Sequence, residues 1–174
     1  MRITAGMKIL WMTWSVGVLA TLAVVLVYPA AGFAQEAPRF FLSNFEGKRF
    51  DSRKHMGPYV VSFFFVNCPP CVKEMPELQE LMEQHLPGVP LLFIDPLKED
   101  TRESIKEFVR KLNVSLAYVY HDAFGRVGKK FNGGKTFREF PTIIAVQDNS
   151  VVFRLVGSQE FDDQLRRKFI DLKP

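Results

Sequence analysis

The stretch "FFFVNCPPCVKEMP", residues 63–76, contains the only two cysteines of this 174-residue chain. The apolar run "YVVSFFFV" leads into it, and a polar segment with apolar residues at roughly helical spacing follows it. The β-branched and aromatic residues of the run predict a central strand over 59–66 that is buried on both faces. The polar segment predicts a helix that starts at the cysteines and is kinked by Pro76.

Structural explanations account poorly for the Cys-x-x-Cys spacing. A purely structural disulfide that closes so small a loop restricts the unfolded chain by only about 2 kcal/mol. Half of a zinc site would lack further ligands, because His55, His85 and His121 are scattered singly along the chain. Two buried apolar cysteines would have no reason to lie at a strand-to-helix junction.

A redox role explains the position of the two thiols. At the start of a helix, Cys68 would meet free N–H groups and the positive end of the helix dipole, which lower the pKa of a thiol. Cys71, one turn later, would be the less exposed partner that attacks a mixed disulfide on Cys68. Pro69 and Pro70 have a fixed φ and no N–H, which suits the start of a helix. The motif therefore predicts one reversible disulfide, without a metal or another cofactor.

Strand-like and helix-like segments alternate along the chain from residue 38 onward. The apolar positions of the helix after the cysteines are Val72, Met75, Leu78, Leu81 and Leu86. The other expected elements are a short strand pair around Gly47, a strand over 89–95, a helix capped by a box of Asp100 and Glu103, a strand over 115–121, a short helix over 123–131, a hairpin of 142–147 with 151–156, and a C-terminal helix. This order predicts an α/β fold with helices on both faces of one mixed sheet.

The cysteine motif and its surroundings resemble a known family. A strand, CPPC and a kinked helix, followed by β-α-β and then by "FPT" ahead of a hairpin, resemble the thioredoxin fold over 38–174. More narrowly, "CPPCVKEMPEL" is similar to the C-x-P-C-x-x-E-x-P signature of the TlpA/ResA branch, whose members are exported and often membrane-anchored thiol–disulfide oxidoreductases. The resemblance implies a thioredoxin-like domain with an inserted βα unit, which 89–114 would supply.

The resemblance also implies roles for individual residues. Cys68 would be the nucleophile and Cys71 the resolving cysteine. Glu74 would be the acid near the thiols that tunes their pKa and takes part in proton transfer, although spacing alone favours a solvated helix glutamate like Glu77 or Glu80. Pro141 would be the cis-proline that faces the disulfide. Asp95 and Asp122, which follow two of the strands, are candidates for further acids near the site, but we favour their interpretation as turn or cap residues.

The substrate groove is where the sequence departs from the family. The residues expected to border the groove are Phe140, Pro141, Pro69 and Pro70. Many relatives have a tryptophan directly before the first cysteine, where this chain has Asn67, and Phe140 is a large residue to precede the proline. These departures bear on the choice of substrate and leave the thiol chemistry unchanged.

The N-terminus has the pattern of a targeting segment. Arg2 and Lys8 precede an uncharged stretch over 9–28, and small residues follow it. A stretch of about 20 residues can span a bilayer, so 1–34 is either a cleaved signal peptide or a retained anchor, with Met1 or Met7 as the start. The positive charge ahead of the stretch predicts a periplasmic or other extracytoplasmic location for the rest of the chain.

Charge argues against a nucleic-acid-binding role. The chain has a formal net charge of +4, and beyond its first 34 residues it contains 21 basic and 19 acidic residues, without a basic stripe.

The leading functional hypothesis is a reductase of disulfides in exported client proteins, supplied with electrons by a membrane thiol donor. The family's commonest task implies apocytochrome c as a client. An oxidant that inserts disulfides would usually carry a large helical insertion, whereas 87–122 has room for one βα unit. A peroxidase is disfavoured because the chain lacks the threonine-containing loop that normally precedes its reactive cysteine. The alternative from another class is a copper-handling or client-binding protein on the same scaffold, with His121 as the sole candidate ligand. The client, the cleavage of the anchor and the oligomeric state stay open.

Overall fold

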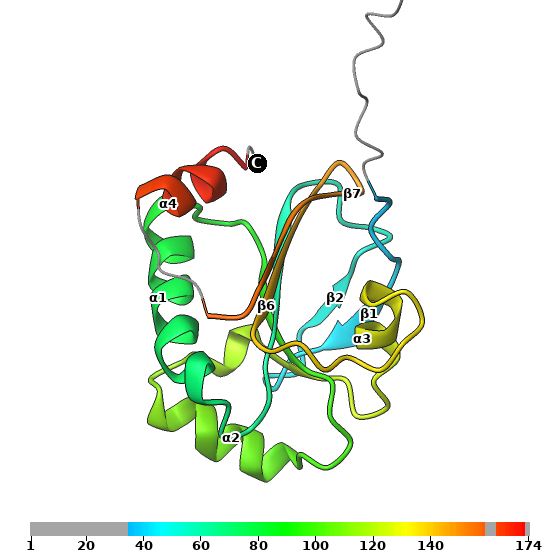
Figure 1. Ribbon diagram of the computed structural model, residues 1–174, viewed down its shortest axis with the longest axis vertical. Helices are drawn as coiled ribbons and strands as arrows, with labels where there is room; N and C mark the ends of the chain where they lie inside the picture. The colour runs from blue at the N-terminus through cyan, green and yellow to red at the C-terminus, as the bar shows by residue number, and fades with distance from the viewer. Residues whose placement is uncertain (1–34, 159–162, 173–174) are drawn as a thin grey trace, which may run out of the picture. The chain divides into compact units, whose positions relative to one another are not determined.

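A computed structural model describes residues 35–158 and 163–172 of the chain (Figure 1). The predicted signal peptide or anchor over 1–34 lies outside the described residues. The elements are β1 (Phe41–Ser43), β2 (Arg49–Asp51), β3 (Tyr59–Phe63), α1 (Pro69–His85), β4 (Leu91–Asp95), α2 (Arg102–Lys111), the 3-10 helix η1 (Leu116–Tyr118), β5 (Val119–His121), α3 (Arg126–Phe131), β6 (Thr142–Gln147), β7 (Ser150–Val156) and α4 (Asp163–Ile170). Within the described ranges, no helix is long and apolar enough to cross a membrane.

A five-stranded mixed sheet in the order β5-β4-β3-β6-β7 forms the centre of the described domain. β3, β4 and β5 are parallel, whereas β6 and β7 run antiparallel to their neighbours. Every residue of β3 is buried, as the apolar run predicts. The predicted mixed α/β architecture of thioredoxin-like type is confirmed, and β4 with α2 forms the expected additional βα unit.

Side chains on the two faces of the sheet belong to two separate apolar clusters. Val60 and Phe93 pack on one face with buried residues of α1, α2 and α4, whereas Val61 and Ile94 pack on the other face with α3 and the N-terminal strands. Figure 1 shows α1, α2 and α4 on one side of the sheet and α3 with β1 and β2 on the other. The strict alternation of strand side chains therefore assigns each sheet residue to one layer.

The predicted N-terminal strand pair exists, but it forms a sheet of its own. β1 pairs with β2 in an antiparallel register, and Gly47 adopts a φ of +87° in the connection. Asn44 attaches this hairpin to η1, since its side-chain amide donates to the Ala117 carbonyl oxygen at 2.7 Å, and its Oδ1 accepts from the backbone N–H of Lys48 within the hairpin.

Two expectations for the helices were wrong. Thr101 caps α2 in a reciprocal box with Ser104, and the expected Asp100–Glu103 box does not form. The side chain of Asp100 instead accepts a hydrogen bond from the Val66 backbone N–H at 3.0 Å, so a tertiary contact competes with the local one. On α1, Val72 is 46% exposed, because the buried face of the helix is centred on Cys71 and Met75, four residues apart.

The predicted C-terminal hairpin is confirmed, with its turn one residue shorter than expected. Ser150 pairs with Gln147, which leaves Asp148 and Asn149 as the two turn residues. Both have positive φ, as a two-residue turn compatible with the twist of the strands requires.

Candidate active site

The two cysteines form a disulfide at the start of α1. Their Cα atoms are 5.3 Å apart, Cys68 is the N-cap residue, and Pro69 and Pro70 are the first two helical residues. Asn67 precedes them with a φ of +63°, and the Cys68 N–H donates to the Phe65 carbonyl oxygen at 3.2 Å. A tight turn thus places one sulfur at the helix N-terminus, where N–H groups favour a thiolate.

The expected difference in exposure between the cysteines is absent in the disulfide form. Both cysteines are 0% exposed and belong to the apolar cluster on the α1 face of the sheet. Phe65, Val66 and Phe140 are partly buried residues that pack against the same cluster. Because neither sulfur is accessible, a client thiolate can reach the disulfide only after a local movement of the surrounding residues.

Glu74 lies three residues after Cys71 on the buried face of α1. It is 2% exposed, whereas Glu80, further along the helix, is exposed. The interpretation of Glu74 as a solvated helix glutamate is therefore wrong. Residues i and i+3 of a helix share one face, so the carboxyl group of Glu74 lies on the side of α1 that carries Cys71.

The segment before β6 lies next to the end of β3, from which the cysteine loop starts. The Phe140–Pro141 peptide bond is cis, and the next residue, Thr142, pairs with Phe63, the last residue of β3. The Phe140 ring meets the Phe65 ring edge to face at 5.1 Å between centroids. The structure therefore brings together two of the residues expected to border the groove, Phe140 and Pro141, and the segment that leads to Cys68.

Asp95 and Asp122, for which the sequence favoured turn or cap roles, lie at the carboxyl ends of β4 and β5. Asp95, the last residue of β4, is 0% exposed, and burial together with the nearby Asp100 and Asp122 carboxyl groups raises its pKa to about 8. Burial also raises the pKa of Asp122, against three hydrogen bonds that its carboxylate accepts from backbone N–H groups at the start of α3. The Asp122 carboxylate thus caps the start of α3 from three residues before the N-cap residue, Gly125, whereas Asp95 is a buried acid. The sequence feature that could have indicated a buried Asp95 is its position directly at the end of an apolar strand.

The candidate copper ligand His121 is the last residue of β5. Its Nε2 lies 3.3 Å from the Leu97 carbonyl oxygen. Among the described residues, no group of three or more His, Cys, Asp or Glu side chains could hold a metal ion.

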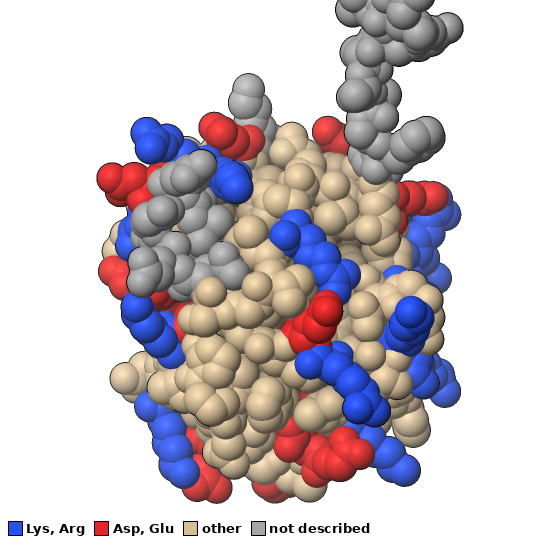
Figure 2. All heavy atoms as spheres, in the orientation of Figure 1, with Lys and Arg blue, Asp and Glu red and all other residues tan. Residues whose placement is uncertain are grey.

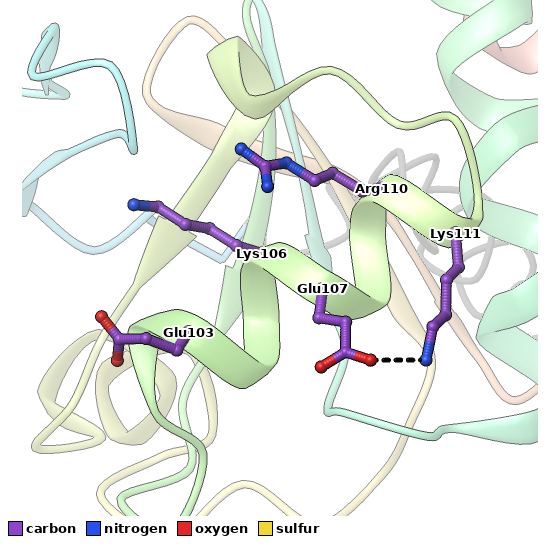
Figure 3. A pocket seen from close by; sticks show the side chains of 5 residues that line it. All are labelled: Glu103, Lys106, Glu107, Arg110 and Lys111. Carbon is purple, nitrogen blue, oxygen red and sulfur yellow. Dashed lines mark ion pairs between the residues drawn. The ribbon is translucent and has the colours of Figure 1, made fainter.

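Surface hollows of the described residues lie away from the cysteines. One is lined by five charged side chains that all come from α2, among them Glu107 and Lys111 in an ion pair of 2.8 Å (Figure 3). Another lies between the N-terminal strands and the start of α3 and includes Phe41 and Phe124. On the face in Figure 2, basic and acidic side chains are interspersed.

Known proteins resemble this chain in sequence and in fold. The model of the AhpC/TSA family matches residues 33–153. The thiol-disulfide oxidoreductase ResA of Bacillus cereus is 28% identical over 128 residues, which cover 72% of this chain and 70% of that protein. ResA of Halalkalibacterium halodurans is 24% identical over 183 residues, covering 95% of each chain. The crystal structure of StoA from Bacillus subtilis superimposes with a TM-score of 0.63 at 20% identity and covers 77% of this chain and 97% of StoA.

Proposed function

The chain belongs to the AhpC/TSA family and is a thiol–disulfide oxidoreductase of thioredoxin-like fold, and we propose that it reduces disulfides in exported client proteins. The observation that carries the proposal is the Cys68–Cys71 disulfide at the N-terminus of α1, with a buried glutamate one turn further on. A pair in this position can alternate between a dithiol and a disulfide without rearrangement of the fold.

The proposed reaction has two exchange steps. In the reduced protein, the Cys68 thiolate attacks one sulfur of a client disulfide, forming a mixed disulfide and releasing the other client sulfur as a thiolate. Cys71 then loses its proton to the Glu74 carboxylate and attacks the Cys68 sulfur. This step closes the Cys68–Cys71 disulfide and releases the second client sulfur. The client gains two electrons, one of its thiolates takes the proton held by Glu74 and the other takes a proton from solvent, and the protein is oxidised.

The N-terminal segment of the chain supports a location outside the cytoplasm. Residues 1–34 have the pattern of a signal peptide or membrane anchor, with residues 9–28 as the part in contact with the membrane. An exported dithiol is oxidised by every turnover, so it needs a membrane thiol donor to return it to the reduced form. The resemblance to the TlpA/ResA branch favours apocytochrome c as the client, with reduction of its oxidised thiols before haem attachment.

The decisive experiment is the equilibrium reduction potential of the Cys68–Cys71 pair, measured with the exported domain in defined thiol–disulfide buffers. A potential near the roughly −270 mV of thioredoxin is expected for a reductant. A potential near about −120 mV would mean that the protein inserts disulfides, and the proposed direction would be wrong.

A further inference from the structure

Asp95, the last residue of β4, lies beside the segment that leads from β3 to Cys68. Phe93 belongs to the apolar cluster on the α1 face and Ile94 to the cluster on the opposite face, so the strand alternation returns Asp95 to the α1 face. Phe64, the residue after β3, donates its N–H to the Ile94 carbonyl oxygen at 3.1 Å. The chain that leads to Cys68 therefore leaves the sheet directly beside Asp95.

Asp95 is buried with unused hydrogen-bonding capacity. Its Oδ1 accepts from the Leu97 backbone N–H at 2.9 Å, whereas its Oδ2 has no hydrogen-bond partner among the described residues. A buried carboxylate with one unsolvated oxygen is costly, and protonation relieves that cost. The protonated form can donate to the neighbouring Asp100, an interaction that further raises the pKa of Asp95.

Asp100 connects this pair of carboxyl groups to the segment before Cys68. Its Oδ2 accepts the Val66 N–H at 3.0 Å, two residues before Cys68. Asp100 is half-buried, whereas Asp95 is fully buried. Asp95, Asp100 and the loop before Cys68 are therefore joined by one short chain of polar contacts.

Titratable side chains also lie on the elements that neighbour Asp95. Asp122, at the end of β5, raises the pKa of Asp95, and His121 is the strand partner of Asp95 across the sheet. Glu74 is the buried acid of α1, which packs on the same face of the sheet. α2 directs apolar residues inward and carries its charged side chains along its outer side (Figure 3).

We propose that Asp95 is a positioning residue whose protonation is coupled to the redox state of the Cys68–Cys71 pair. Reduction by two electrons and one proton converts the disulfide into a Cys68 thiolate and a Cys71 thiol. The new negative charge at Cys68 disfavours a second anion at the carboxyl end of β4, beside the segment that leads to Cys68, so an ionised Asp95 takes up one further proton from solvent. Oxidation removes the thiolate charge and releases that proton.

The coupling predicts an extra pH dependence of the reduction potential. Between the pKa of Asp95 in the oxidised form and its higher pKa in the reduced form, each two-electron reduction consumes one additional proton. The equilibrium constant against a dithiol reference of known potential then falls by up to about tenfold more per pH unit than it does without Asp95. This inference rests on the redox activity of the pair, but it does not depend on the direction in which the protein transfers electrons.

The test is a series of redox titrations from mildly acidic to alkaline pH on the full-length protein and three variants. Asp95→Asn should lose the additional pH-dependent segment. Asp100→Asn keeps an acceptor for the Val66 N–H but removes a charge, so it should move the segment to lower pH. Glu99→Gln, an exposed residue of the same loop, should follow the wild type. The absolute potential tests the proposed reductase function, whereas only the pH dependence tests the coupling.

A second measurement needs no variant. Carbon-13 NMR titration of the aspartate carboxyl groups in the oxidised and reduced wild-type protein should give a higher Asp95 pKa in the reduced form. Equal Asp95 pKa values in the two redox states would overturn the proposal. Superimposable potential curves for the wild type and a folded Asp95→Asn variant would overturn it as well.

Discussion

At the residue scale, burial gives the acids near the disulfide different tasks. Glu74 is buried on the helix face that carries Cys71, so its carboxyl group is suited to accept the Cys71 proton in the second exchange step. Asp122 is buried too, but three backbone N–H groups hold its carboxylate as a helix cap. The donors around a buried carboxyl group therefore decide whether it is held as a helix cap or is available for the proton transfer proposed for Glu74.

Glu74→Gln should slow the resolution of the mixed disulfide. Glutamine keeps the shape of the side chain but cannot take up a proton, and loss of such a group typically costs roughly 100-fold or more in rate. The measurement is single-turnover release of client thiol from the reduced protein, with Glu80→Gln, an exposed residue of the same helix, as the control. An unchanged rate in a folded Glu74→Gln variant would exclude Glu74 from proton transfer.

Asp95 should make the folded protein less stable as the pH rises through the neutral range. Its pKa is raised from 3.8 to about 8, so between these values the folded state holds a proton that the unfolded state has released. The free energy of unfolding then falls with increasing pH by at most roughly 1.4 kcal/mol per pH unit in this window. Asp95→Asn should remove this slope.

Urea denaturation of the oxidised protein at several pH values between 4 and 8 provides the check on Asp95. Glu99→Gln serves as the matched control, because it removes an exposed carboxyl group from the same loop. Parallel profiles for the wild type and Asp95→Asn would show that Asp95 ionises normally in the folded state.

At the element scale, the ends of the helices position the site. α1 starts directly at the disulfide, and α2 starts beside the loop in which Asp100 holds the Val66 N–H. The reciprocal capping hydrogen bonds between Thr101 and Ser104 determine where α2 begins, which leaves Asp100 outside the helix and available to the segment before Cys68. Loosening this helix end would therefore affect the cysteine loop as well.

Thr101→Ala should lower the free energy of unfolding by about 1 kcal/mol, because it removes the side-chain acceptor of the Ser104 N–H. Thr101→Ser retains a hydroxyl group and should stay close to the wild type. Urea denaturation of the three proteins measures the difference. If Thr101→Ala is neutral while Asp100→Ala is strongly destabilising, Asp100 rather than Thr101 controls this end of the helix.

At the scale of the whole molecule, the disulfide lies at one edge of a sheet whose two faces are both covered. The three parallel strands end at the same edge, where β3 leads to the cysteines, β4 ends in Asp95 and β5 is followed by Asp122. In open α/β sheets, this carboxyl edge is where functional groups commonly gather. Because the sheet is packed on both faces, we expect a change of redox state to affect the segment around the cysteines and the charges next to it rather than the sheet.

The oxidised protein should be more stable than the reduced protein, by up to about 2 kcal/mol, because the disulfide restricts the unfolded chain. Folding and reduction form a thermodynamic cycle, so such a difference makes the pair harder to reduce in the folded than in the unfolded protein. Denaturation with and without dithiothreitol measures it, and a Cys68→Ser, Cys71→Ser double variant should not respond to the reagent. Greater stability of the reduced form would indicate an oxidising protein.

Local patterns in the sequence were sufficient to predict the redox motif, the buried central strand, the alternation of strands and helices, and the C-terminal hairpin. Each follows from near neighbours: two thiols one helical turn apart, a continuous apolar run, or turn residues between two strands. Only the tertiary structure shows that Glu74, Asp95 and both cysteines are buried and that the N-cap residue of α2 is Thr101. These features depend on contacts between segments far apart in the chain, such as that of Asp100 with Val66, and the desolvation that changes a carboxyl group's pKa arises only when such segments pack together.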